Sequence, residues 1–266
     1  MGATVKTAVA DGVARLTLDR PDAMNSFDGD TARAIVDAVE AFAVDDSVRV
    51  LVIGSEGRAF SAGGDFNWVL TWPGLDAITR RVGADAMMGA VQAIYDFPKP
   101  SIARVHGATV GGGVGLMLAC DFAVASSKAR FGLTSVRNGL LAGIAIPVLI
   151  EAVGPRVARQ LLMHGGLFDA DTALRIGLVD QVAEPDALDE SVATLSRELM
   201  LGAPSVQSLI KELIPVIDSR AHDAGTAELI GEHVAAQCTS DEALEGMRAF
   251  LDKRKPRWTV RCSPRS

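Results

Sequence analysis

The chain is poor in the residues that carry disulfide and metal chemistry. Its 266 residues include three cysteines and four histidines. Cys120, Cys238 and Cys262 are too widely spaced for a Cys-x-x-Cys pair, and the histidines show no metal-ligand spacing. A disulfide framework or a structural zinc site would need such spacings. We therefore expect free thiols in a reducing compartment and no bound metal.

Long apolar runs and an excess of basic residues are also missing. No apolar stretch approaches the roughly 18 residues of a membrane-spanning helix, and residues 1–6 show no signal-peptide core. The net charge is −7, which disfavours nucleic acid as the main partner because phosphate binding needs a broad basic surface. We expect a cytoplasmic protein that binds neither membranes nor nucleic acids.

What remains is the composition of a globular protein, 48% hydrophobic and 22% charged. Alternating residues around the turn at Asp11-Gly12 predict a hairpin over residues 3–19. Apolar stripes and continuous apolar runs then predict helices and buried strands in alternation, over 30–43, 48–53, 75–96, 100–105, 116–120 and 121–125. This alternation favours an α/β core built from strand–helix–strand units.

Past residue 185 the pattern becomes helical. Pro204 begins one apolar stripe, and Thr239 with Glu242 fits a capping box ahead of another. We therefore divide the chain into an α/β core over residues 1–184 and an α-helical C-terminal region over residues 185–266.

Two glycine-rich segments follow buried strands, at residues 59–66 (AFSAGGDF) and 106–115 (HGATVGGGVG). Glycine lets backbone amides approach a ligand closely, and a helix start adds amides without internal partners. Two such loops facing one point would form an oxyanion hole. Alternatively, both are tight turns packed against their neighbours.

Other glycine motifs do not fit these segments. A phosphate-binding loop needs a Gly-Lys pair that neither segment has, and Leu116 stands where a dinucleotide fingerprint requires glycine. No Gly-x-Ser-x-Gly elbow occurs in the chain, which disfavours a hydrolase with that nucleophile.

Taken together, the two loops resemble those of the crotonase (enoyl-CoA hydratase/isomerase) superfamily. Further segments match in family order and spacing over nearly the whole chain, at 18–25, 99–103, 129–132, 177–179 and 250–256. Within the superfamily, four segments are most similar to bacterial hydratases of branched glutaconyl-CoA thioesters, at 66–68, 102–107, 113–116 and 133–137.

The resemblance implies a spiral of ββα units followed by an α-helical C-terminal region that mediates assembly into trimers or dimers of trimers. It implies an acyl-CoA substrate, with coenzyme A as part of the substrate and no separate cofactor. It also implies that the amides of Gly64 and Gly112 form the oxyanion hole. The residues that it places along coenzyme A are Met24, Ser26, Ala62, Asp65, Phe66, Phe250 and Lys253.

The sequence departs from the family hydratases at both catalytic glutamates. The first position falls at Gly115 and the second at Ser135, while the aspartate of other branches falls at Gly143. Serine without a partner is a poor base at neutral pH, and losing one general acid–base group costs roughly 10²–10⁴ in rate. Efficient hydration by the usual route is therefore not expected.

Several side chains allow two interpretations of their role. Asp65 either bonds its own loop or acts on the substrate, and His106 is either structural or a base. Arg137 either forms a surface ion pair or clamps a second carboxylate of the substrate, while Trp68 and Trp72 either pack a helix or line an acyl pocket. A basic tail either stays solvated or meets the phosphates of coenzyme A, through Lys253, Arg254, Lys255, Arg257, Arg261 and Arg265.

Three functions remain open. The first is an acyl-CoA enzyme that works through an enolate, by hydration or double-bond isomerisation, and the paired glycine loops favour it. The second is a non-catalytic acyl-CoA binder or assembly subunit. The third is a thioester hydrolase or a carbon–carbon bond cleaving enzyme. The missing glutamates favour the second and third.

Overall fold

The strands form two sheets in residues 4–260, the part of the chain that the computed structural model describes. The larger sheet has the order β1-β2-β3-β5-β7-β10 and the smaller one the order β4-β6-β8-β9. The strands are Val5–Ala10 (β1), Val13–Leu18 (β2), Val50–Ser55 (β3), Ala59–Ser61 (β4), Ser101–Val105 (β5), Ala108–Val110 (β6), Phe122–Ser126 (β7), Arg130–Gly132 (β8), Leu167–Asp169 (β9) and Gln181–Ala183 (β10). In the pairs β3/β4, β5/β6 and β7/β8, the first strand joins the larger sheet and the second joins the smaller one. Repetition of this step produces a spiral of ββα units.

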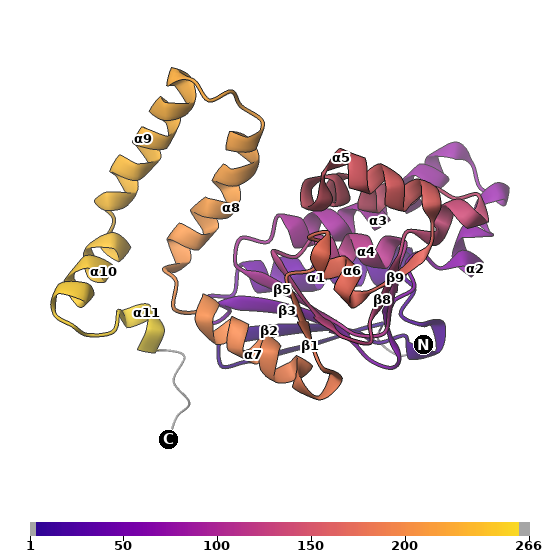
Figure 1. Cartoon of the computed structure of the whole chain (residues 1–266), viewed down its shortest axis with the longest axis horizontal. Helices are drawn as coiled ribbons and strands as arrows, with labels where there is room; N and C mark the ends of the chain where they lie inside the picture. Colours follow the sequence, from indigo (N-terminus) through magenta and orange to yellow (C-terminus); the bar gives the residue numbers. More distant parts are fainter. Residues whose placement is uncertain (1–3, 261–266) are drawn as a thin grey trace.

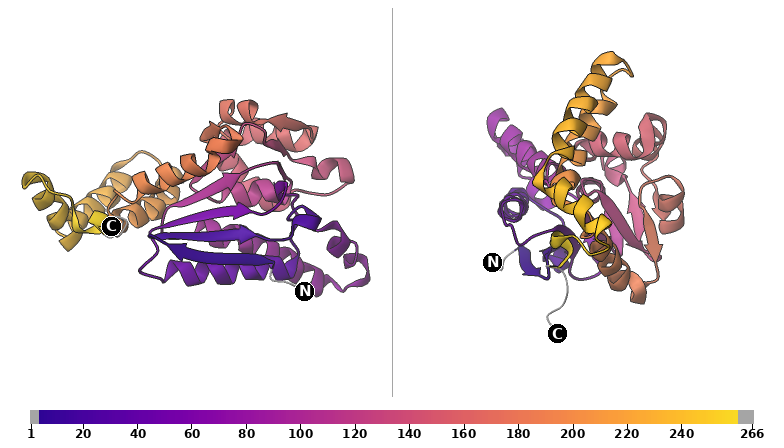
Figure 2. Two further views of the ribbon diagram at one scale, coloured as in Figure 1. Left: turned by 90° about the horizontal axis from the view of Figure 1, so that it is seen from below. Right: turned by 90° about the vertical axis from the view of Figure 1, so that its left-hand side faces the viewer.

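Helices cover both faces of the larger sheet (Figures 1 and 2). The helices are Gly29–Ala43 (α1), Phe66–Val69 (α2), Ala77–Tyr95 (α3), Gly112–Leu118 (α4), Ile146–His164 (α5), Ala170–Arg175 (α6), Leu188–Leu199 (α7), Pro204–Asp218 (α8), Ala224–Cys238 (α9), Asp241–Leu251 (α10) and Arg257–Val260 (α11). The main core joins one face of the sheet to α1, α3, α4 and α5. Helix α7 covers the other face, where Leu188 and Val192 pack on Val50, Val52 and Ile102. No helix within residues 4–260 combines the length and apolarity needed to cross a bilayer.

The N-terminal hairpin is confirmed, with Val5 opposite Leu18 and Ala10 opposite Val13. Both turn residues have positive φ, 51° at Asp11 and 82° at Gly12, as two-residue turns with the twist of a hairpin require. On β2, Ala14, Leu16 and Leu18 are buried, so the predicted apolar face is the one that meets the core.

The second glycine segment is partly helical, contrary to the predicted helix start at residue 116. Helix α4 begins at Gly112, and its N-cap Gly111 has φ 54°. Glycine has a low intrinsic helix propensity, so the local sequence gives no helix signal for this first turn. Packing explains the composition, because a β-carbon on Gly113 would collide with the backbone carbonyl of Ser61. The glycines thus let α4 lie directly against the end of β4.

Helices α8, α9 and α10 form an arm that projects from one end of the body (Figures 1 and 2). Pro204 begins α8 as predicted. The predicted capping box at Thr239 is wrong, since α10 begins one residue later and the side chain of Ser240 accepts the hydrogen bond from the amide of Ala243 (3.1 Å). Glu242 instead accepts a hydrogen bond from the backbone amide of Ser205 (3.1 Å). Its carboxylate therefore joins two helices of the arm.

The arm exposes many apolar side chains. Hydrogen bonds from Arg49 hold the two ends of the arm together where it meets the body. The exposed side chains are Ile210, Ile214, Val216, Ile230, Val234, Leu244, Met247, Phe250 and Leu251. At the base, Arg49 donates hydrogen bonds to the carbonyls of Gly202 (2.9 Å) and Trp258 (3.2 Å). This arginine therefore ties both ends of the arm to the body. The boundary drawn between residues 184 and 185 stays a prediction, and α7, beyond it, packs on the sheet.

Candidate active site

Two segments far apart in the sequence, 24–27 and 61–65, lie side by side at one end of the body. Three backbone hydrogen bonds join them, from Ala62 to Met24 (2.9 Å), from Phe27 to Gly63 (2.8 Å) and from Asp65 to Phe27 (3.0 Å). A side-chain bond from the Ser61 hydroxyl to the carbonyl of Asn25 (2.8 Å) adds a fourth. The first glycine loop is therefore held against the stretch that contains Met24 and Ser26.

The amide of Gly64 differs from its neighbours within this stretch. The amide of Gly63 donates to the Ser61 hydroxyl (3.1 Å), and the amide of Asp65 is bonded to Phe27. Among the residues that the structure describes, Gly64 donates no comparable hydrogen bond. Buried backbone amides are nearly always paired. An unpaired N–H group at this half-buried glycine is therefore available to a ligand.

The amide of Gly112 lies at the contact between the two glycine loops. As the first residue of α4, Gly112 has no intrahelical acceptor for its N–H group. A β-carbon on Gly63, where φ is 84°, would lie 2.7 Å from the nitrogen of Gly112 and 2.8 Å from the carbonyl oxygen of Val110. The two loops thus meet without a side chain between them, and each contributes one such amide.

Apolar side chains surround the two glycines. A β-carbon on Gly64 would lie 3.0 Å from the Met87 methyl group of α3. One on Gly112 would lie 2.7 Å from Ile144 and 3.1 Å from the ring of Phe27. Because electrostatic interactions are stronger in apolar surroundings, an amide pair here would act on a carbonyl oxygen more strongly than in water. No motif in the sequence singles out Phe27, Met87 or Ile144, so their place beside the glycines was missed.

The two glutamate positions of the family differ in their surroundings. Ser135 lies in a short 3-10 helix over Thr134–Asn138, and its hydroxyl oxygen is 3.3 Å from the position of a β-carbon on Gly111. This hydroxyl therefore lies beside the start of α4. At Gly115, inside α4, a β-carbon would lie 3.3 Å from the α-carbon of Ala145. Ala145 thus occupies the space that a larger side chain at residue 115 would need.

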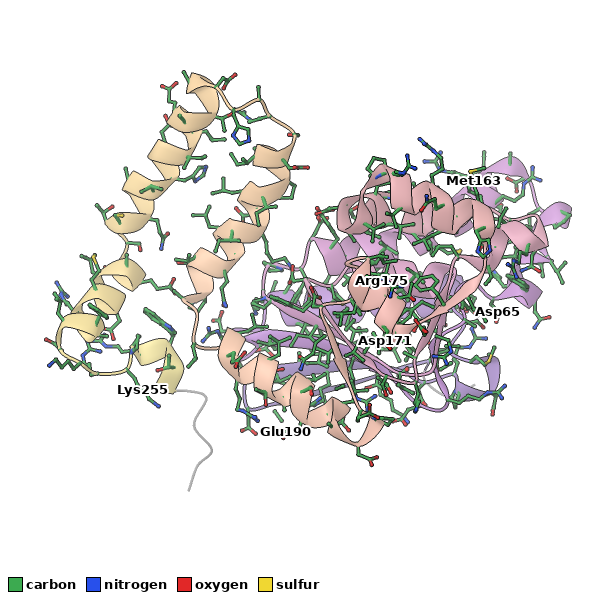
Figure 3. The ribbon with its side chains drawn as sticks, in the orientation of Figure 1. Asp65, Met163, Asp171, Arg175, Glu190 and Lys255 are labelled. Atoms are coloured by element: carbon green, nitrogen blue, oxygen red, sulfur yellow. The ribbon has the colours of Figure 1, made fainter. Side chains whose placement is uncertain are left out.

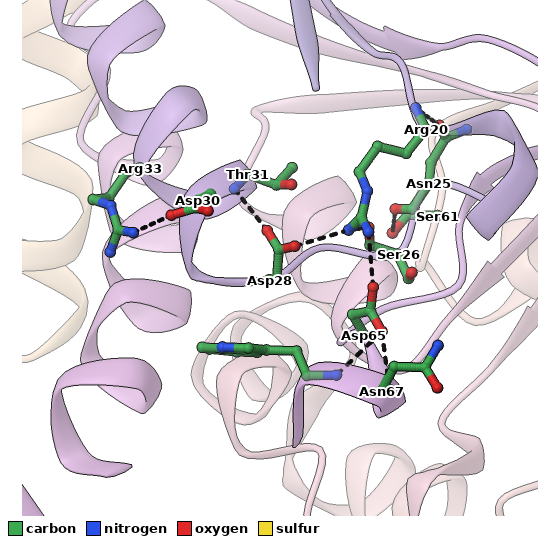
Figure 4. A network of polar contacts seen from close by, with 11 residues as sticks. Arg20, Asn25, Ser26, Asp28, Asp30, Thr31, Arg33, Ser61, Asp65 and Asn67 are labelled. Carbon is green, nitrogen blue, oxygen red and sulfur yellow. Dashed lines mark hydrogen bonds and ion pairs between the residues drawn. The ribbon is translucent and has the colours of Figure 1, made fainter. Parts of the chain in front are cut away.

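Asp65 is bonded within its own loop and to Arg20 (Figure 4). One carboxylate oxygen is 2.9 Å from the Arg20 guanidinium. The other accepts hydrogen bonds from the amides of Asn67 (2.9 Å) and Trp68 (3.4 Å), which caps α2. The next residue, Phe66, is half exposed.

The two tryptophans pack a helix. The rings of Trp68 and Trp72 meet edge to face with their centroids 5.1 Å apart. Both rings cover Gly83 of α3, where a β-carbon would lie 3.1 Å from Trp72 and 3.2 Å from Trp68. Glycine at residue 83 therefore lets α3 approach this aromatic pair.

His106 and Arg137 form local contacts within the chain. His106 makes hydrogen bonds through both ring nitrogens, to the carbonyl of Gly57 (2.8 Å) and to Arg104 (3.2 Å). The exposed guanidinium of Arg137 makes weak hydrogen bonds to the carbonyl of His164 (3.3 and 3.4 Å). The structure thus gives His106 and Arg137 partners other than the two glycine loops.

The segment around Met24 has an unusual backbone. Met24 and Asn25 are consecutive residues with positive φ, 50° and 52°. The Asn25 side chain holds this conformation by donating to the carbonyls of Glu56 (2.7 Å) and Ala59 (2.8 Å) and accepting from the amide of Arg20 (2.8 Å). Asn25 therefore fixes the path of the segment that carries Met24 and Ser26.

Phe250 and Lys253 lie at the far end of the molecule. Figure 3 shows Asp65 and Lys255 at opposite ends of the chain, and Phe250 in α10 is 83% exposed. One chain therefore does not bring these two residues to its own glycine loops. In the basic tail, Arg254 and Arg257 pair with Glu245, and the hydrogen bond from Arg254 is the largest of the effects that lower the pKa of Glu245 to about 2. Arg261 and Arg265 lie outside the described residues.

The chain is similar to known proteins in both sequence and structure. Residues 8–261 match the sequence model of the enoyl-CoA hydratase/isomerase family. The chain is 35% identical to the crotonyl-CoA hydratase of Syntrophomonas wolfei, over 91% of this chain and 93% of the relative. It is 31% identical to the trans-2-decenoyl-[acyl-carrier-protein] isomerase of Streptococcus mutans, over 94% and 96%. The crystal structure of an enoyl-CoA hydratase from Shewanella pealeana superposes with a TM-score of 0.92 at 30% identity, and 96% of each chain is covered.

Proposed function

The chain is an enzyme of the enoyl-CoA hydratase/isomerase family with the crotonase fold, and from this premise we propose that it binds the thioester carbonyl of an acyl-CoA between the amides of Gly64 and Gly112. Reactions at the α and β carbons of such a thioester pass through an enolate, whose negative charge collects on the carbonyl oxygen. One preset N–H donor to such an oxygen is typically worth about 3 kcal/mol. The observation that carries the proposal is the contact of the two loops, each with an amide that donates no hydrogen bond to another residue between 4 and 260.

The reaction that follows the enolate depends on the groups that move protons. We favour double-bond isomerisation or a hydration-type step, with Ser135 as the hydroxyl beside Gly111 that contacts the reacting part of the substrate. The hydroxyl of Ser135 lies against the start of α4, where it can hydrogen-bond to a water molecule or to the acyl group. Gly115 contributes no proton-transfer group, and Ala145 lies against it.

A catalytically impaired acyl-CoA binder is the second candidate. Its support is the wall of apolar side chains around the two glycines together with the space taken by Ala145 beside Gly115. Such a site would retain carbonyl recognition while it lacks the carboxylate pair of a hydratase. A thioester hydrolase or carbon–carbon bond cleaving enzyme stands behind these two, since no particular contact favours it.

For the rest of the substrate, we propose that coenzyme A follows the segments with Met24, Ser26, Ala62, Asp65 and Phe66. Of these, Asp65 contributes as a member of the loop rather than through a free carboxylate. Phe250 and Lys253 would reach coenzyme A from a second copy in a trimer or a dimer of trimers. The exposed apolar side chains of the arm support such assembly, because patches of this kind mark interfaces. Arg137 as a clamp for a second carboxylate, and the cytoplasm as the compartment, remain predictions.

The test is a mass-spectrometric assay of the purified enzyme against a panel of enoyl-CoA and glutaconyl-CoA thioesters. Gly112→Val, which places side-chain atoms against Ile144 and Phe27, should abolish turnover and weaken binding of a thioester analogue. Gly89→Ala is the matched control, because nothing lies within 4 Å of its β-carbon position. Calorimetric binding without turnover of any thioester would favour the second candidate. Release of free coenzyme A would favour the third.

A further inference from the structure

One arginine joins the two segments that frame the candidate site. Arg20 follows β2, and its guanidinium donates to the carbonyl of Ser26 (2.7 Å) and lies 2.9 Å from Asp65 and 3.3 Å from Asp28 (Figure 4). Its side chain is 24% exposed. These contacts use both terminal nitrogens of the guanidinium, so one side chain spans the 24–28 segment and the 61–65 segment.

Each carboxylate that faces Arg20 also starts a helix. Asp65 caps α2, and Asp28 caps α1 by accepting a hydrogen bond from the amide of Thr31 (2.9 Å). Burial alone would raise the pKa of Asp28, but the hydrogen bonds from Thr31 and the charge of Arg20 outweigh it and keep that pKa below its ordinary value. Both carboxylates are thus fixed by bonds on two sides.

Asp65 directly follows Gly64 and is 8% exposed. Its backbone amide is bonded to Phe27 and its carboxylate is bonded to Arg20. A shift of Asp65 would therefore carry the neighbouring peptide groups of Gly64 with it. An exposed ion pair contributes little, but a mostly buried carboxylate that loses its cation is left uncompensated and tends to move toward solvent.

We propose that Arg20 is a positioning residue that holds the amide of Gly64 in place against the second glycine loop. The inference rests on the proposed function of that amide. A planar guanidinium with several fixed donors suits this task, since a lysine at residue 20 could satisfy only part of the set. The same side chain links the stretch proposed to hold coenzyme A to the stretch proposed to hold the thioester oxygen.

The first experiment measures backbone hydrogen exchange in the unliganded protein. In Arg20→Met and in Asp65→Asn, peptides that cover residues 60–66 should exchange faster by roughly tenfold, as expected for local opening. Arg20→Lys should fall between these variants and the parent. Arg197→Met is the control, because it removes a surface ion pair with Glu190 on α7. It should leave peptides 60–66 unchanged.

The second experiment compares kcat and KM with an acyl-CoA and with the acyl-pantetheine thioester that the parent turns over. Arg20→Met should lower kcat about 10- to 100-fold with both substrates, as a misplaced catalytic group does. Arg197→Met should stay within about twofold, because it leaves the glycine loops intact.

The negative results of these experiments have different meanings. A parent enzyme with no turnover and no thioester binding would reject the proposed function, while the exchange measurement still decides whether Arg20 holds the loop. Unchanged exchange over residues 60–66 in both Arg20→Met and Asp65→Asn would overturn the positioning role. A kcat that stays at the parent level in folded Arg20→Met would overturn it as well. If Arg20→Met does not fold, Asp65→Asn carries both measurements.

Discussion

The nitrogen of Gly112 lies 2.7 Å from the point where a β-carbon on Gly63 would stand. Gly63 also has φ 84°, a region that side chains rarely adopt. We therefore expect Gly63→Ala to lose about 2 kcal/mol or more of unfolding free energy from backbone strain, and to lose turnover because the loops must separate. Urea unfolding and steady-state assays measure the two effects. A variant with parental stability and activity would contradict this geometry.

Gly89→Ala should stabilise the protein, whereas Gly63→Ala should destabilise it. Gly89 lies inside α3, and its β-carbon position has no neighbour within 4 Å. Replacing a helix-interior glycine that has free space with alanine should stabilise the protein by about 0.5–1 kcal/mol. Urea unfolding checks the sign, and turnover should equal that of the parent. A loss of stability would mean that the surroundings of Gly89 are more crowded than the structure shows.

Ser135→Glu would restore a carboxylate beside the start of α4. If proton transfer limits the rate, hydratase activity should rise at least tenfold, because a general acid–base group contributes roughly 10²–10⁴. Ser135→Gln is the control for side-chain size without charge. The assay follows hydration of an enoyl-CoA by mass spectrometry. A glutamate variant no faster than the glutamine variant would show that the surrounding pocket prevents hydration.

Tyr95 is the only tyrosine, so its ionisation can be followed directly by absorbance at alkaline pH. Burial, followed by its hydrogen bond to Glu151 (3.1 Å), raises the pKa of Tyr95 from 10.0 to about 12. Because the fold favours the neutral phenol, the stability that it contributes is complete below pH 10 and is lost as the pH rises through about 12. Glu151→Gln should lower the observed midpoint. A midpoint near 10 in folded protein would disprove the shift.

Glu245 should stabilise the end of the arm in its ionised form. The hydrogen bond from Arg254 is the largest contribution to its lowered pKa, which falls from 4.5 to about 2. The stability gained from the carboxylate is therefore present above pH 4.5 and is lost as the pH falls through about 2. Glu245→Gln should be less stable than the parent at pH 5, and the difference should shrink toward pH 2. Urea unfolding at each pH checks this trend, and a constant difference would contradict it.

The elements that local sequence predicted well are those with a regular apolar period. The hairpin follows from alternation and turn chemistry, and the start of α8 follows from the preference of proline for the first helical turn. Helix α4 was predicted too late because three glycines in a row carry no helix signal, while close packing against Ser61 requires them. The cap of α10 was misplaced by one residue because Thr239 and Ser240 are both acceptable caps, and only the path of the chain chooses between them.

The candidate site was less predictable, since it depends on contacts between distant segments. The two glycine loops were recognisable, but only the folded chain shows that the amides on either side of Gly64 are bonded to Ser61 and Phe27. Arg20 drew attention only as part of a motif, because its partners Ser26, Asp28 and Asp65 become neighbours only in the folded chain. The direction of the arm, and hence the distance of Phe250 from the glycine loops, is likewise set by tertiary packing.

Because both candidate donors belong to the main chain, binding of the thioester carbonyl does not depend on the side chains that move protons. Replacing a side chain deletes an acid or a base outright, but it removes neither N–H group. Such an enzyme can continue to bind a thioester while the reaction that it catalyses on that thioester changes. Engineering a new reaction in this scaffold would therefore start from residue 135, with both loops left as they are.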